Sequence, residues 1–153
     1  MTALLGTSAL IQVAIVVKDI EVTKRKWAEF FGIEPPPTMG SGSYEVTKAT
    51  YMGKPAPDIG CKMAFFYVGP NVSLELIEPN GVKSTWQDFL DENGEGIHHI
   101  AFGVKNTDEK IASCEKAGMT LVQRGKYGDG SGEYAYLDAT ASLKCIVETL
   151  ESF

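Results

Sequence analysis

The sequence has few basic residues, and this shortage excludes one class of partner. Its 153 residues include 14 Lys and Arg against 20 Asp and Glu, which gives a formal net charge of -6. A protein that binds a phosphate backbone needs clustered Lys and Arg to neutralise it. Nucleic acid is therefore not an expected partner.

Cysteines and long apolar runs are also scarce. The three cysteines are widely spaced and form no CxxC motif, so we expect neither a disulfide framework nor a zinc ribbon. A reducing, cytoplasmic setting fits this usage best. The apolar stretch 3–17 is interrupted by Gly6, Thr7, Ser8 and Gln12, and no basic residue precedes it. It differs from a signal peptide or a spanning helix, and no membrane partner is expected.

The chain has only two histidines, His98 and His99, and they are neighbours. Side chains alternate along a strand, so adjacent residues are expected on opposite faces and cannot both reach one ion. A ring-cleaving dioxygenase needs two histidines and one carboxylate on Fe(II), so that class is not expected. We predict His99 as a metal ligand and His98 as a packed or supporting residue.

Several local patterns predict a βαβββ unit in the first half of the chain. A β-branched apolar run at 12–17 indicates a strand, and Asp19 stands where a helix N-cap is expected. Gly32 closes the helix that follows. Three strand-like runs come next, at residues 44–51, 62–68 and 72–78, with a turn at 69–71.

The same pattern then begins again after a helix-like segment capped by Ser84. Residues 99–106 (HIAFGVKN) match residues 12–19 (QVAIVVKD) position by position. A second helix, near 108–117, ends at Gly118. The sequence predicts an α+β fold of two tandem βαβββ modules forming a curved mixed sheet around a metal-binding cleft. The modules, residues 1–80 and 97–153, flank a connecting helix in 81–96 and together form one compact domain, and the later strands are expected at 120–124, 133–138 and 144–150.

Polar residues at matched repeat positions predict a metal site. Gln12 interrupts an apolar strand at the position equivalent to His99, and Glu75 and Glu148 each stand inside hydrophobic sequence on the last strand of a module. Buried carboxylates require a partner, which a cation can supply. One amide, one imidazole and two carboxylates make a mostly hard ligand set. We predict one divalent ion, with Zn, Ni, Co, Mn and Fe(II) all compatible.

The glycine-rich segment 125–132 (GKYGDGSG) lies between two predicted strands. Because it does not open a helix, it does not fit a phosphate-binding loop. We predict a hairpin over the site.

Residues 94–102 (GEGIHHIAF), preceded by residues 74–79 (LELIEP) and the connecting helix, resemble methylmalonyl-CoA epimerases of the vicinal oxygen chelate superfamily. Those epimerases usually have His as the first ligand, whereas Gln12 stands here. The Gln, Glu, His, Glu set resembles the zinc form of glyoxalase I. The resemblance implies Glu148 as the residue that transfers the proton. In some epimerases the base is an acidic residue on a strand of the first module, and this position aligns near Phe65 here. Because phenylalanine is not acidic, Glu45 is the nearest alternative base by sequence.

These patterns leave three functions open. The first is a metal-dependent epimerase or isomerase that removes a proton α to the carbonyl of an acyl-CoA. The second is a glyoxalase I-type lyase acting on a thiol hemithioacetal, and the third is a non-catalytic protein that binds small drug molecules. An open duplicated sheet leaves edges that a second copy can cover, so we expect a homodimer.

Overall fold

The structure is a computed structural model that describes residues 3–153. The strands are β1 (Leu10–Val16), β2 (Met39–Gly40), β3 (Thr50–Tyr51), β4 (Lys54–Pro55), β5 (Cys61–Tyr67), β6 (Ser73–Pro79), β7 (Gly96–Gly103), β8 (Thr120–Lys126), β9 (Gly132–Asp138) and β10 (Ile146–Ser152). The helices are α1 (Ile20–Phe31), α2 (Tyr44–Thr47), α3 (Thr85–Asn93), α4 (Thr107–Lys116) and α5 (Thr140–Leu143). No helix within residues 3–153 is both long enough and apolar enough to cross a membrane.

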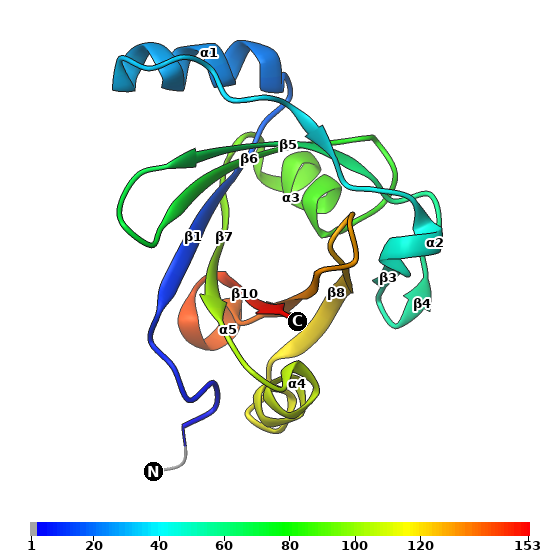
Figure 1. Cartoon of the computed structure of the whole chain (residues 1–153). Coiled ribbons are helices and arrows are strands. Elements are labelled where there is room, and N and C mark those ends of the chain that lie inside the picture. The colour runs from blue at the N-terminus through cyan, green and yellow to red at the C-terminus, as the bar shows by residue number, and fades with distance from the viewer. Residues whose placement is uncertain (1–2) are drawn as a thin grey trace.

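One curled mixed sheet holds all the strands, in the order β2-β5-β6-β1-β7-β10-β9-β8-β3-β4 (Figure 1). Its two halves meet where β1 pairs antiparallel with β7. Away from this seam, β1 pairs parallel with β6 and β7 pairs parallel with β10. The predicted α+β fold with a curved mixed sheet is confirmed.

The strand register shows that the two halves are related by a local two-fold. Across the seam, Gln12 pairs with Ala101 and Ala14 pairs with His99, so exchanging each residue for its repeat partner turns one pair into the other. In the same way, Ala14 pairs with Glu75 in one half and Ala101 pairs with Glu148 in the other. The alignment of residues 12–19 with 99–106 therefore describes a real structural repeat.

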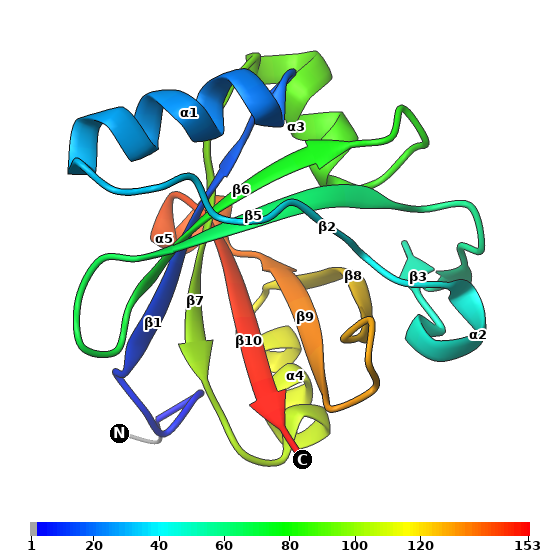
Figure 2. The same ribbon diagram turned by 45° about the horizontal axis from the view of Figure 1, so that its top comes forward.

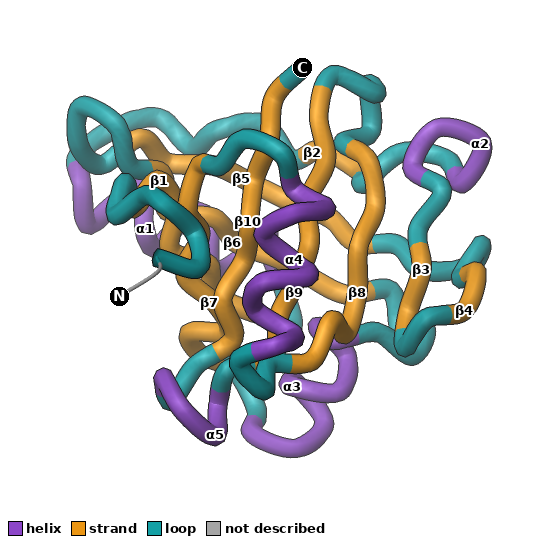
Figure 3. Tube along the Cα trace, turned by 90° about the horizontal axis from the view of Figure 1, so that it is seen from below, coloured by secondary structure: helices purple, strands orange, loops and turns teal. Residues whose placement is uncertain are grey.

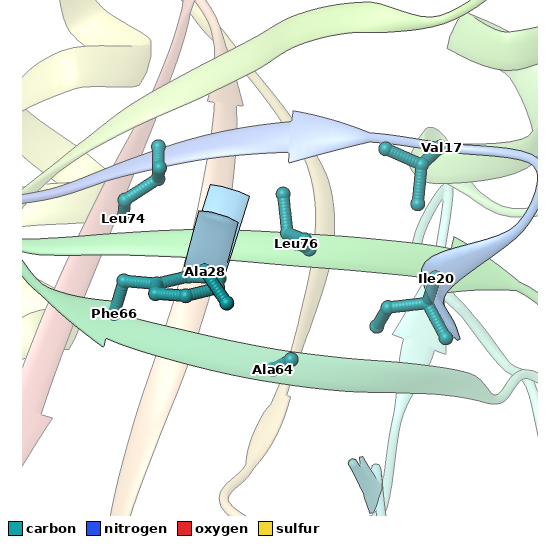
Figure 4. Close-up of a cluster of buried hydrophobic side chains, with 7 residues drawn as sticks. All are labelled: Val17, Ile20, Ala28, Ala64, Phe66, Leu74 and Leu76. Atoms are coloured by element: carbon teal, nitrogen blue, oxygen red, sulfur yellow. The ribbon is translucent and has the colours of Figure 1, made fainter. Parts of the chain in front are cut away.

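Helices α1 and α4 cover the outer, convex face of the sheet, one on each half (Figures 2 and 3). Under α1, a buried apolar cluster contains Val17, Ile20, Ala28, Ala64, Phe66, Leu74 and Leu76 (Figure 4). A second cluster, on the α4 side, contains Cys114, Met119, Leu137, Ala139 and Val147. The concave face has its own cluster, which includes Ala14, Ile77, Trp86 and Tyr136. Strand alternation thus gives this sheet an apolar surface on both faces.

The helix ends follow the sequence signals. The Asp19 side chain accepts a hydrogen bond from the Val22 N–H at 2.9 Å, and Gly32 ends α1 in the left-handed conformation at φ 69°. Ser84 caps α3 by accepting from the Gln87 N–H at 3.0 Å. These caps fix where α1 begins and ends and where α3 begins.

The predicted strand over residues 44–51 is wrong except for its last two residues. Residues Tyr44–Thr47 form one helical turn, which Lys48 ends in the left-handed conformation at φ 47°. Thr50–Tyr51 then pairs with β8 of the opposite half. The two-residue strand Met39–Gly40, which was not predicted from the sequence, pairs with β5. Short alternating runs are compatible with either a strand or a helical turn, and here the chain crosses between the halves instead of extending the first.

Candidate active site

The four predicted ligand residues converge at the centre of the concave face. The Gln12 Nε2 donates to Glu75 Oε2 at 2.8 Å and to Glu148 Oε2 at 3.3 Å. The His99 Nε2 lies 2.9 Å from Glu148 Oε2 and 3.7 Å from Glu75 Oε2. The Ser73 hydroxyl donates to Gln12 Oε1 at 3.2 Å. Residues far apart in sequence thus meet because β6, β1, β7 and β10 are consecutive in the sheet.

All four side chains are almost completely removed from solvent. Gln12, Glu75, His99 and Glu148 are 7%, 5%, 0% and 2% exposed. Burial raises the pKa of Glu148 to about 8, and a hydrogen bond with the Tyr136 hydroxyl offsets part of that rise. Burial also raises the pKa of Glu75, and the negative charge of Glu148 raises it further. Two carboxyl groups held this close need a cation or a shared proton between them.

The His99 ring has one nitrogen without a hydrogen bond. Burial lowers the pKa of His99 to about 3, so the ring is neutral at pH 7. Although Nε2 faces the carboxylates, it makes no hydrogen bond to them or to any other described residue. An orphaned imidazole nitrogen that points at two carboxylates matches the arrangement of a metal ligand.

His98 lies beside His99 and not on the opposite face, so the expectation from strand alternation is wrong. In the seam register His99 pairs with Ala14 and Ile97 pairs with Ile15, which leaves His98 as the extra residue of a β-bulge. The bulge brings the two rings together, with 2.8 Å between their Nδ1 atoms. His98 is also buried, at 3% exposed. The prediction of a supporting role for His98 fits this position.

An open cavity of about 440 Å³ lies directly over Gln12, Glu75 and Glu148. This volume is typical of small-molecule sites. Apolar and aromatic side chains supply much of its wall: Met39, Met63, Phe65, Trp86, Tyr127, Tyr134, Tyr136 and Leu150. Its polar lining includes Ser41, Lys126, Asp129 and Ser131.

The sequence-predicted alternative base does not reach this cavity. Glu45 lies exposed on α2 and is absent from the described residues that line the cavity. Phe65 does line it and pairs with Glu75 across β5 and β6. The structure therefore places an aromatic ring where the resemblance led us to look for an acid. The cavity carboxylates among the described residues are Glu75, Asp129 and Glu148.

Asp129 was missed in the sequence because it lies in the glycine-rich β8–β9 loop (residues 127–131), whose position no local pattern reveals. That loop lies over the site as predicted, since Tyr127, Gly128, Asp129 and Ser131 all line the cavity. Within the loop, Asp129 Oδ1 accepts from the Ser131 hydroxyl at 2.6 Å and from its N–H at 2.9 Å.

The β8–β9 loop is held against the segment that precedes α2 by contact between two glycines. A Cβ atom added to Gly42 would lie 2.6 Å from the Gly128 Cα, and Gly42 has φ +90°. On the other side, a Cβ on Gly128 would lie 3.0 Å from the Ser41 carbonyl oxygen. Only residues without side chains allow this approach. The contact joins segments of the two halves over the cavity.

The four residues fit a divalent ion by donor type and spacing. An octahedral ion with bonds of about 2.1 Å separates neighbouring ligand atoms by about 3 Å, and His99 Nε2 lies 2.9 and 3.7 Å from the nearest oxygens of Glu148 and Glu75. Within residues 3–153 no three His, Cys, Asp or Glu side chains are already arranged as a metal site. The Gln12 amide turns its NH₂ group toward both carboxylates, so an ion would require its oxygen there instead.

Residues 11–136 match the glyoxalase/bleomycin resistance protein/dioxygenase superfamily. This segment covers most of the chain and includes β1, the seam and three of the four predicted ligands. The chain belongs to this superfamily.

Two curated proteins are similar to this chain in sequence. The chain is 28% identical over 139 residues to an ethylmalonyl-CoA/methylmalonyl-CoA epimerase of Cereibacter sphaeroides, covering 89% of this chain and 92% of the relative. It is 32% identical over 90 residues to the uncharacterized protein YqjC of Bacillus subtilis, covering 58% of this chain. That second match spans 64% of the length of YqjC.

Solved structures share the fold. Methylmalonyl-CoA epimerase from Mycobacterium tuberculosis superposes with a TM-score of 0.69 at 18% identity, covering 100% of this chain and 93% of that one. A Streptomyces coelicolor methylmalonyl-CoA epimerase in complex with 2-nitronate-propionyl-CoA gives a TM-score of 0.67 at 21% identity, covering 94% and 96%. The hypothetical protein BH1468 from Bacillus halodurans gives 0.68 at 23% identity, covering 96% of both.

The glycine contact over the cavity generates a stability prediction. We expect Gly42→Ala to force the two segments apart and to lower the free energy of unfolding by about 1–3 kcal/mol, from overpacking and left-handed strain. Amide hydrogen exchange should become faster at Tyr127 and Gly130, whose N–H groups bond within the loop at 2.9 and 2.8 Å. Gly40→Ala is the matched control, because its Cβ would meet no atom within 4 Å. Equal exchange in both variants would contradict the contact.

Proposed function

We propose that this protein is a metal-dependent epimerase that removes and returns a proton α to the thioester carbonyl of an acyl-CoA. The observation that carries the proposal is the convergence of two carboxylates, an imidazole and an amide, of which the carboxylates and the amide line a largely apolar cavity. The epimerase name of a relative matched over 89% of this chain supports the same reaction.

Gln12, Glu75, His99 and Glu148 would hold the divalent ion. When bound, the ion would stabilise the negative charge that develops on the substrate carbonyl oxygen. Glu75 and Glu148 would offset most of the charge of the ion, and the aromatic and apolar cavity wall would exclude water from the reacting carbon. Zn, Ni, Co and Mn all suit this donor set.

Glu148 is the proposed base for the α-proton, a role in which its carboxylate would leave the ion. It lines the cavity and comes from β10, so its carboxylate faces the space in which an acyl group would lie. Epimerisation also requires delivery of a proton to the opposite side of the carbon. Asp129 lies in the β8–β9 loop over the site and is the remaining cavity carboxylate that could serve there.

Solvent exchange tests this assignment. In D₂O we expect the α-proton of methylmalonyl-CoA or ethylmalonyl-CoA to be replaced by deuterium, followed by NMR or mass spectrometry. Glu148→Gln should slow exchange by at least about 100-fold, as expected when an acid–base group is lost. Asp129→Asn should slow inversion of the α-carbon configuration more than it slows exchange of the α-proton with solvent. Glu45→Gln, on the exposed α2, should change neither rate.

Two results would contradict the assignment. Absence of exchange for every acyl-CoA, with each candidate metal present, would rule out the epimerase. Normal inversion by Asp129→Asn would remove Asp129 from the mechanism while leaving the role of Glu148 intact.

Metal binding is tested separately from turnover. We expect the purified protein to take up one equivalent of a divalent ion, measured by elemental analysis and by competition with a chelator. Gln12→Ala and Glu148→Gln should each weaken metal binding by at least about tenfold. Loss of a residue that only supports a ligand already lowers metal affinity by about that factor, and loss of a ligand should lower it at least as much. Glu29→Gln on the surface of α1 should bind normally. Equal affinity in all four proteins would show that the ion is held elsewhere.

A glyoxalase I-type lyase is the second candidate, and the amide at Gln12 favours it because glyoxalase-like sites resemble this ligand set. The test is lactoylthiol formation from methylglyoxal with glutathione or another thiol, using the same metal-loaded samples. Turnover here without α-proton exchange in acyl-CoA would select the lyase.

A further inference from the structure

The hydrogen bonds of the two adjacent histidines determine where their protons lie. His98 Nε2 is 3.2 Å from the Thr85 carbonyl oxygen, which can only accept. The Thr85 hydroxyl, also 3.2 Å from His98 Nε2, can accept as well, so one N–H on Nε2 suits both contacts and we expect the proton there. A neutral imidazole has one N–H group, so His98 Nδ1 carries a lone pair and acts as an acceptor.

The contact between the rings then fixes the tautomer of His99. The two Nδ1 atoms are 2.8 Å apart, a distance that requires one proton between them. Because His98 Nδ1 accepts, His99 Nδ1 must donate. The single N–H of a neutral His99 is then on Nδ1, and its Nε2 keeps a free lone pair. This nitrogen lies 2.9 Å from Glu148 Oε2 without hydrogen-bond geometry, and because two facing lone pairs repel, a cation or a carboxyl proton is needed between the two atoms.

The surroundings hold His98 in this orientation. The Phe89 ring meets His98 edge-on with 5.3 Å between centroids, and Tyr136 contacts it from another side at 5.6 Å. Thr85 is itself fixed, since its N–H donates to the buried Gln123 Oε1 at 2.9 Å. A chain of hydrogen bonds therefore runs from β8, through the start of α3, to the ligand set.

We propose that His98 is a positioning residue that, together with the Thr85 carbonyl, locks His99 in its Nδ1–H tautomer and so presents the Nε2 lone pair to the ligand set. The inference deepens the proposed function and rests on it, because only a metal-dependent enzyme would use His99 Nε2 as a ligand. Metal-bound histidines commonly donate their other N–H to a partner that sets tautomer and orientation. Here that partner is a neutral imidazole, which a β-bulge brings into reach.

The test reads both tautomers directly, because His98 and His99 are the only histidines in the chain. In ¹⁵N-labelled, metal-free wild type, with each ring assigned to its residue through the backbone resonances, long-range ¹H–¹⁵N correlation spectra should show His98 as the Nε2–H form and His99 as the Nδ1–H form. His98→Phe keeps an aromatic ring and removes the acceptor. The remaining His99 should then lose its Nδ1–H preference, and Zn²⁺ affinity should fall about 10–100-fold.

Two further variants separate this role from simple packing. His98→Asn retains an acceptor oxygen near the place of Nδ1, and we expect it to restore the Nδ1–H tautomer and much of the Zn²⁺ affinity. Thr85→Val removes the hydroxyl, which also lies 3.2 Å from His98 Nε2, but keeps the carbonyl, so the tautomers should not change.

The proposal would be overturned if wild type held His99 as the Nε2–H form, a measurement that needs no variant. It would also be overturned if His98→Phe left both the His99 tautomer and Zn²⁺ affinity unchanged. Neither reading depends on turnover. Failure of the epimerase assay with the expected tautomers would therefore remove the proposed reaction and leave the tautomer lock in place.

Discussion

The burial of two carboxylates side by side is the constraint on which the rest of this structure depends. Glu75 and Glu148 are 5% and 2% exposed, and both lie within hydrogen-bonding reach of one amide nitrogen. Such a pair is costly unless its charge is compensated. The fold keeps the pair because each carboxylate is on a strand whose other face packs under α1 or α4. Neither can turn to solvent without reversing its strand.

The same constraint explains why much of the site was predictable from sequence. Strand alternation assigned Gln12 and His99 to equivalent positions, and Glu75 and Glu148 followed from the second half of each repeat. The seam register confirms that equivalence. A period of two and a duplicated pattern together placed four residues in space without knowledge of any contact between them.

What could not be predicted depends on departures from regular periodicity. The bulge at His98 adds one residue to β7 and changes which side the ring faces, and no local residue preference marks it. The segment 44–51 passes from one half of the sheet to the other, so pairing with β8 decides its structure. Asp129 reaches the cavity through a glycine contact between distant loops, which only the folded chain reveals.

Gln12 suits this site because an amide can act in both directions. Its Nε2 donates to both carboxylates while Ser73 Oγ donates to its Oε1 at 3.2 Å, so these hydrogen bonds stabilise the cluster. A half-turn of the amide would present the oxygen to a cation and leave N–H to donate to the Ser73 hydroxyl, which can also accept. The amide is neutral in both orientations, so the charge of the site is set by Glu75, Glu148 and the ion. An imidazole in place of Gln12 would also be a neutral ligand, and for this reason the exchange of His for Gln need not alter the proton-transfer chemistry.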